Sequence, residues 1–83
     1  MNIYRKVTSS WNGVVEEVFV HRGSYVYEWE PLFLIKTLDG STKIVQVNTS
    51  GDIEILKVKK GDHVTIESEL AILQEDFLPT GCD

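Results

Sequence analysis

The stretch Ile35-Lys36-Thr37-Leu38-Asp39-Gly40-Ser41-Thr42-Lys43-Ile44 lies in the middle of this chain and joins two strand-like runs. An Asp-Gly pair between alternating apolar residues is typical of a β-hairpin, because a type I′ turn needs a positive φ at both central positions. With Asp39-Gly40 as the loop, Lys36 is expected directly opposite Lys43. Two interpretations of this pair remain open: solvated ammonium groups on an exposed ladder, or a small anion clamp or modification site.

The sequence on either side of this hairpin forms an internal repeat. Residues 12–36 align with residues 50–74 at a constant offset of 38. The alignment pairs six identical residues: Gly13 with Gly51, Glu16 with Glu54, Val20 with Val58, Gly23 with Gly61, Val26 with Val64, and Leu32 with Leu70. Because self-similarity constrains an architecture more than propensities do, each half is expected to fold as the same unit.

Each half is predicted to contain short strands separated by turns. Gly23 and Gly61 suit turn positions that need a positive φ. A first strand is expected from Ile3 to Thr8, a short run from Tyr25 to Trp29, and an apolar strand from Leu32 to Ile35. No segment shows a long helical period. Many short strands at regular spacing predict a small all-β sandwich or barrel.

Length and charge narrow the class of protein. A chain of 83 residues predicts a single domain, which we place at residues 1–77, followed by a flexible C-terminal tail at residues 78–83 that carries the one cysteine, Cys82. The formal net charge of −5 argues against nucleic acid or an anionic membrane as partner, since both require a basic face. No apolar run is long enough to cross a bilayer and none forms a signal-peptide core, so we expect a cytoplasmic protein.

The duplicated pattern of Gly, Val, Gly-Asp-x-Val and Leu resembles the biotinyl/lipoyl-carrier family over about Ser9 to Gln74. The second half matches with Gly51, Val58, Gly61-Asp62, Val64 and Leu70. In the first half, Ser24 replaces the family's usual Asp, and Trp29 stands where Gly or Asn is common. The resemblance implies a barrel-sandwich hybrid, which consists of two small four-stranded sheets related by a pseudo-twofold axis.

The resemblance also implies where a cofactor would be attached. Carriers of this family present a lysine on an exposed hairpin turn, and its amine takes biotin or lipoate as an amide. Here the tip comprises Leu38, Asp39, Gly40 and Ser41, and the equivalent position falls on Asp39, whose carboxylate cannot form that amide. We therefore expect no cofactor. The alternative is a biotin or lipoate carrier subunit of a carboxylase or 2-oxo-acid dehydrogenase complex, modified at Lys36 or Lys43.

Other reactive residue types show no catalytic or metal-binding pattern. His21 and His63 lie beside the two Gly turns but lack the spacing and partners of a zinc site. The serines have no acid–base partner in a recognisable arrangement. We therefore predict neither an enzyme nor a metal site.

The aromatic residues carry the clearest functional signal. Alternation along a strand would place Tyr25, Tyr27 and Trp29 on one side and Val26 on the other, while Trp11 would lie on a loop. The family resemblance implies that Val26 belongs to the core. The rings could be tucked against strand edges. Alternatively, these four residues could form an interaction surface, because Tyr and Trp are enriched at interface hot spots. The resulting hypothesis is a non-enzymatic protein-interaction or assembly module that binds a protein partner or another copy of itself.

Overall fold

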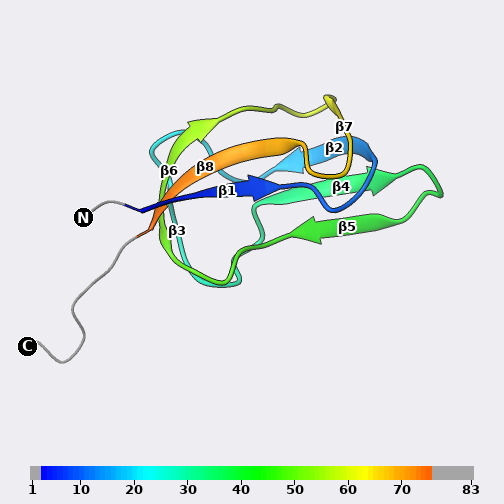
Figure 1. Ribbon diagram of the computed structural model, residues 1–83. Helices are drawn as coiled ribbons and strands as arrows, with labels where there is room; N and C mark the ends of the chain where they lie inside the picture. The colour runs from blue at the N-terminus through cyan, green and yellow to red at the C-terminus, as the bar shows by residue number, and fades with distance from the viewer. Residues whose placement is uncertain (1–2, 76–83) are drawn as a thin grey trace, which may run out of the picture.

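The computed structural model describes residues 3–75, which form eight strands and no helix (Figure 1). The strands are β1 Tyr4–Thr8, β2 Gly13–Val18, β3 Tyr25–Val26, β4 Phe33–Thr37, β5 Thr42–Val45, β6 Gly51–Leu56, β7 His63–Val64 and β8 Glu69–Glu75. Since no described residue is helical, no helix in this part of the chain could span a membrane. Cys82 and the predicted tail at residues 78–83 lie outside the described residues.

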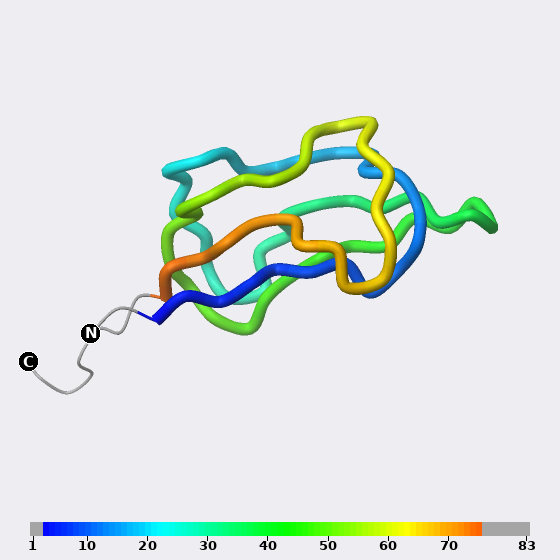
Figure 2. Tube along the Cα trace, turned by 45° about the horizontal axis from the view of Figure 1, so that its top comes forward, coloured from blue at the N-terminus to red at the C-terminus, as the bar shows by residue number. Residues whose placement is uncertain are grey.

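The strands form two antiparallel four-stranded sheets. Their orders are β1-β8-β6-β3 and β5-β4-β2-β7. The offset of 38 residues relates the strands of the two halves. It places β2 on β6 and β3 on β7 residue for residue. It also places β1 on β5 and β4 on β8, with differences only at the strand ends. Each half therefore contributes strands to both sheets, as the winding of the chain in Figure 2 shows. The architecture is the predicted barrel-sandwich hybrid with an internal twofold repeat.

The core is built from equivalent positions of the two halves. The buried pairs are Val7 with Val45, Val15 with Ile53, Val26 with Val64, Leu32 with Leu70, Phe33 with Ala71, and Ile35 with Leu73. Burying one large aliphatic side chain contributes about 1.5–3 kcal/mol. Two of these pairs, Val26 with Val64 and Leu32 with Leu70, are identities of the sequence repeat, so core packing accounts for this apolar part of the repeat.

Both halves also share a close backbone approach. A Cβ atom on Gly13 would lie 2.1 Å from the Lys36 carbonyl oxygen, and one on Gly51 would lie 2.0 Å from that of Gln74. No side chain fits at such distances. The identity between Gly13 and Gly51 therefore reflects strand packing rather than turn flexibility.

Bulges and turns repeat as well. The register shifts next to Glu16 in β2 and next to Glu54 in β6, so both identical glutamates mark β-bulges. Gly23 and Gly61 have φ values of +91° and +96°, which confirms their predicted role. Ser24, in the first of these turns, accepts a hydrogen bond from a backbone N–H with its hydroxyl.

The central hairpin differs from the sequence-based prediction. Lys36 pairs with Thr42, and Lys43 pairs with Ile35, so the predicted register is wrong by one residue. Within the loop only Gly40 has a positive φ, at +89°, which excludes a type I′ turn. The loop is the three-residue kind, in which a glycine in the left-handed region follows the turn. A slip of one residue turns side chains to the other face, so Lys36 and Lys43 point to opposite sides of the sheet.

Candidate functional site

The tip of the β4–β5 hairpin carries a carboxylate that is part of the loop structure. Asp39 Oδ1 accepts hydrogen bonds from the Thr37 hydroxyl and, at 3.0 Å, from the Ser41 backbone N–H. These bonds, led by the one from Thr37, lower the pKa of Asp39 from 3.8 to about 2. Next to it, the Leu38 side chain is 87% exposed. The tip therefore presents an ionised acid and an apolar side chain.

The two candidate lysines lie in strands rather than in this loop. Lys36 is exposed on the outer face of its sheet, between Val14 and Thr42. Lys43 is half-buried and shares a side of the sheet with Ile35. Lys36 and Lys43 lie on opposite sides of the sheet in the observed register, so they are not placed to form the anion clamp that was one of the two interpretations of this pair.

The tyrosines form a pair on the outside of the sheet that contains β1 and β3. Val26 is fully buried, as predicted, and Tyr25 is 39% exposed. The Tyr25 and Tyr27 rings meet edge to face, with centroids 5.1 Å apart. Tyr25 also ends a cross-strand row that runs through Asp52 and Gln74 to Tyr4. Tyr4 could not be assigned to this row from the sequence, because only the strand order reveals that β1 and β3 share this sheet.

Trp29 does not continue the strand that carries the tyrosines. β3 ends at Val26, and Trp29 lies in the following turn with a φ of +66°. Its backbone N–H donates to the Val47 carbonyl at 2.9 Å, and its own carbonyl accepts from the Gln46 side chain at 2.7 Å. The predicted strand alternation is therefore wrong beyond Val26. The Trp29 side chain is nevertheless 59% exposed.

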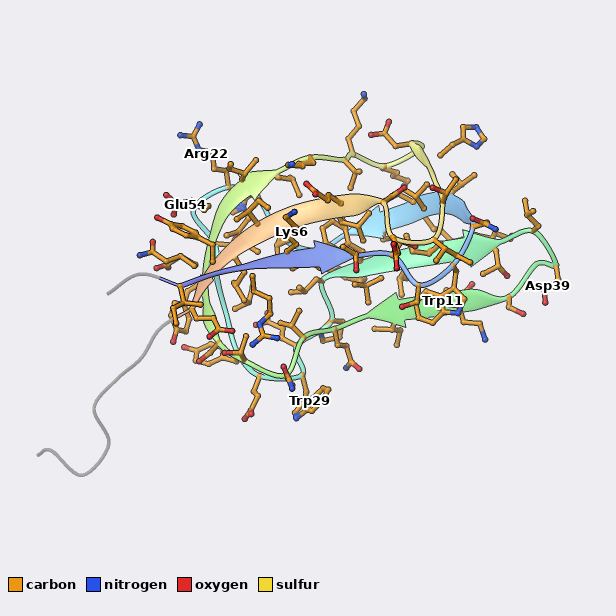
Figure 3. All side chains as sticks on the ribbon, viewed as in Figure 1. Lys6, Trp11, Arg22, Trp29, Asp39 and Glu54 are labelled. Atoms are coloured by element: carbon orange, nitrogen blue, oxygen red, sulfur yellow. The ribbon has the colours of Figure 1, made fainter. Side chains whose placement is uncertain are left out.

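Trp11 is placed apart from the other three aromatics. It is half-buried, packs against the core, and lines a groove at the hairpin end together with Leu38, Lys43 and Ile66. Figure 3 shows Trp11 on the same side of the molecule as Asp39, with Trp29 set apart from both. The four aromatic residues predicted to form one surface therefore occupy different places.

A second groove runs along the edge of β1. It is lined by Arg5, Lys6, Val7, Thr8, Ser10, Trp29, Gln46, Val47 and Asn48. Alternate side chains of a strand point to opposite faces, so four consecutive strand residues can line one groove only when it follows the strand edge. Trp29 and the segment after β5 form the opposite wall. This groove could not be predicted from the sequence, because its walls come from three distant segments.

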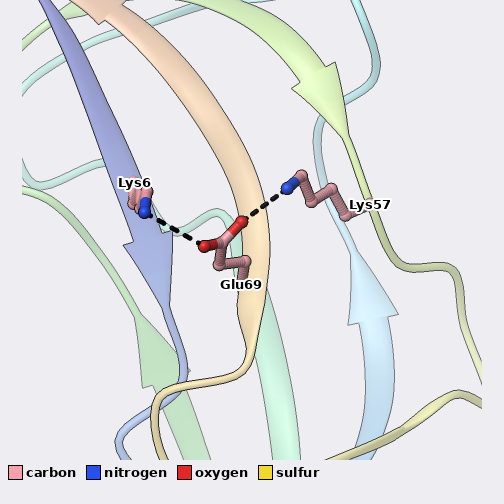
Figure 4. Close-up of polar contacts among 3 residues, drawn as sticks. All are labelled: Lys6, Lys57 and Glu69. Atoms are coloured by element: carbon pink, nitrogen blue, oxygen red, sulfur yellow. Dashed lines mark hydrogen bonds and ion pairs between the residues drawn. The ribbon is translucent and has the colours of Figure 1, made fainter.

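Ion pairs hold the cations beside this edge. The Glu69 carboxylate contacts the Lys57 ammonium at 2.5 Å and that of Lys6 at 3.3 Å (Figure 4). These contacts, with the Lys57 hydrogen bond the larger, lower the pKa of Glu69. Arg5 Nε contacts the buried Glu75 carboxylate at 2.5 Å. Each contact leaves other N–H groups of Arg5 and Lys6 available to a ligand.

The histidines are not brought together with other potential ligands. The His21 ring nitrogen Nδ1 lies 2.9 Å from the Ser24 hydroxyl, within its own turn. His63 is exposed in β7, which is an edge strand of the sheet β5-β4-β2-β7. Within residues 3–75, no three His, Cys, Asp or Glu side chains gather as a metal site would require.

Comparison with known proteins supports the fold. No family model and no curated protein sequence matches the chain. The crystal structure of the Kluyveromyces lactis urea carboxylase matches with a TM-score of 0.77 and 18% sequence identity. The match covers 86% of this chain but only 6% of that one, so this chain spans a small fraction of the larger protein. Together with the two repeated sheets, this likeness identifies the fold as a biotinyl/lipoyl-domain-like barrel-sandwich hybrid.

Proposed function

We propose that this protein is a non-enzymatic, unmodified biotinyl/lipoyl-like domain that acts in the cytoplasm as a protein-interaction or assembly module. The observation that carries the proposal is the hairpin tip. Its three loop residues are Leu38, Asp39 and Gly40, and the carboxylate of Asp39 is occupied by hydrogen bonds within the loop. An amide to biotin or lipoate needs an amine, and this loop offers none.

The exposed aromatics support an interaction role. Tyr25 and Tyr27 form a pair on one sheet, and Trp29 lies beside the groove along β1. Burial of a large exposed aromatic ring by a partner removes much apolar surface from water, and such rings are therefore enriched among the residues that contribute most to binding free energy. With a net charge of −5, the chain favours a protein partner or a second copy over nucleic acid or an anionic membrane.

One observation favours the alternative, a carrier subunit of a carboxylase or a 2-oxo-acid dehydrogenase complex. The structural neighbour is a carboxylase, and Lys36 is exposed near the tip, where a modifying enzyme could reach it. Attachment at this position would place the cofactor on the outer face of a sheet. That position gives a swinging arm a shorter reach than a hairpin turn does.

Intact mass distinguishes the two functions. The chain is co-expressed with a biotin ligase and, separately, with a lipoate ligase, and a true carrier domain in the same cells shows that each ligase is active. We expect an unmodified mass in both cases. A mass gain that peptide mapping places on Lys36 or Lys43 would establish the carrier function instead.

The interaction role is tested with the double variant Tyr27→Ala and Trp29→Asn. Both side chains are exposed, so the variant should fold, and circular dichroism checks this. We expect loss of self-association in sedimentation or of partner capture from the native extract. Leu38→Ala, which removes an exposed apolar side chain at the far tip, is the matched control. Unchanged association of the folded double variant would refute the aromatic surface.

A further inference from the structure

The free edge of β1 has the features of a strand-binding site. Within residues 3–75, β1 pairs with β8 alone, so its outer edge has no neighbouring strand. An edge strand leaves alternate backbone N–H and C=O groups unpaired, and an extended peptide can add to them. The groove follows this edge for the four residues from Arg5 to Thr8.

The groove selects its ligand by charge. Arg5 and Lys6 are the charged residues that line it. Arg5 pairs with Glu75, and Lys6 shares Glu69 with Lys57, so this edge keeps one positive charge in excess in a chain whose net charge is −5. The remaining polar lining consists of hydroxyl and amide side chains. An acidic segment fits these groups, because carboxylates can use the N–H donors that Glu69 and Glu75 leave free.

Trp29 provides a fixed apolar wall. A bulky residue with a φ of +66° is uncommon, since the left-handed region costs an ordinary residue about 1–2 kcal/mol. The fold itself does not require the ring, because the equivalent Glu67 adopts a φ of +72° with a different side chain. The Trp29 backbone N–H donates to the Val47 carbonyl and the Gln46 side-chain amide donates to the Trp29 carbonyl, so both backbone polar groups of this residue are hydrogen-bonded. An ordered, exposed ring is suited to contact an apolar side chain of a bound strand.

The twofold repeat contains an internal control. The edge of β5 is equivalent to that of β1, but there Glu67 stands in the place of Trp29 and Ile44 in the place of Lys6. A carboxylate at the equivalent wall repels an acidic ligand. Lys43 stands in the place of Arg5, so the β5 edge combines one cation with the carboxylate of Glu67 and lacks the positive excess of the β1 edge.

From these observations we infer that the groove between the free edge of β1 and Trp29 binds an extended acidic segment of a protein partner by strand addition. This inference rests on the proposed interaction function and specifies its partner. Main-chain hydrogen bonds to β1 supply the attachment. Arg5 and Lys6 point to opposite faces of β1, so each attracts an acidic side chain on its own face of the added strand, and Trp29 covers an apolar one.

The test uses the whole chain, labelled with 15N, and a capped heptapeptide of alternating Glu and Val as the probe. We expect saturable amide shifts in residues 5–8 and 46–48 and at the Trp29 indole N–H. Residues 43–45 of the β5 edge, which lie outside this groove, should shift far less. The same peptide with Lys in place of Glu, and one with N-methylated alternate amides, should not bind.

Variants then locate the binding energy. Trp29→Asn suits a positive φ and should keep the fold while weakening binding about tenfold, the effect of removing a hot-spot ring. Glu67→Asn, the same type of change at the equivalent turn, should leave the affinity unchanged. Equal binding of the Lys peptide, shifts centred on β5, or no saturable shift would overturn the inference.

The outcomes separate this inference from the proposed function. If the peptide fails while the mass stays unmodified and association still depends on Tyr27, only the β1 site is lost. If a ligase modifies the chain while the peptide binds at β1, the groove stands and the non-carrier function falls.

Discussion

The two halves of the molecule, residues 4–37 and 42–75, satisfy equivalent backbone N–H groups with different side chains. At the first turn, the His21 N–H donates to the Ser24 hydroxyl at 3.0 Å; at its equivalent, the Lys59 N–H donates to the Asp62 carboxylate at 2.9 Å. The next turn repeats this, with Glu30 and Ser68 as acceptors. The fold thus requires an acceptor at each place and not a particular residue.

The halves also show what the fold does not require. The Thr37 N–H donates to the Ser41 carbonyl at 2.8 Å in the hairpin, and the Glu75 N–H donates to the Ile3 carbonyl at 2.8 Å at the equivalent end. The first of these pairs is joined by the hairpin loop, whereas the second joins the first and last described residues, Ile3 and Glu75. Trp29 and Glu67 differ in the same way, since one backbone conformation carries a ring in one half and an acid in the other. Such differences mark the positions where function can be sought.

The largest expected loss of stability comes from substituting the close-packed glycine of either half, and it should be equal in the two halves. Gly13→Ala and Gly51→Ala each force a Cβ into a backbone carbonyl at close to 2 Å, so each should destabilise the protein by about 3 kcal/mol or more. Urea denaturation measures the free energy of unfolding. Gly23→Ala is the graded control: its Cβ would meet open space, and only the positive φ should cost about 1 kcal/mol. If the two strand variants were no worse than this control, the close approach would be disproved.

The acceptor comparison predicts a smaller effect. Ser24→Ala should destabilise the first turn by about 1 kcal/mol, the usual net value of one hydrogen bond. Asp62→Ala should act in the same direction on the second turn. Hydrogen exchange of the His21 and Lys59 amides would locate each loss in its own half. Protection lost across both halves from one substitution would show that the turns are not independent.

Trp29 and Glu67 sharpen the comparison further. Asn adopts a positive φ at a lower energetic cost than Trp or Glu. Replacing either residue by Asn should therefore raise the free energy of unfolding by up to about 1 kcal/mol, as measured by thermal denaturation. Of the two, only Trp29→Asn should also lose the binding described above. A clear loss of stability in Trp29→Asn would instead mean that the ring packs against the body, and its role would be structural.

The smallest effect is a pH dependence confined to the hairpin. The folded pKa of Asp39, about 2, is below its ordinary value of 3.8. Its contribution to stability is therefore complete above about pH 4 and disappears as the pH falls through about 2. NMR titration of the carboxyl group, with hairpin amide exchange recorded in parallel, measures both. In Asp39→Asn this acid-sensitive step should vanish.

Much of the fold could be predicted from local signals. The offset of 38 between repeats and the positive φ of Gly23 and Gly61 follow from spacing and residue type, and the burial of Val26 was implied by the family resemblance. The register of the hairpin could not. Asp39-Gly40 is compatible with a two-residue and a three-residue loop, and these differ by one residue in register.

The sequence by itself determined the twofold architecture, because each half contains the same apolar positions, turns and close-packed glycines. Only the tertiary structure decided which surfaces these halves create. The hairpin register is set where β4 lies between β2 and β5, and the turn at Trp29 is set by the Val47 carbonyl. The groove along β1 exists because sheet order brings three distant segments together. Such long-range pairings have no local signature, since each segment is ordinary until its neighbour is in place.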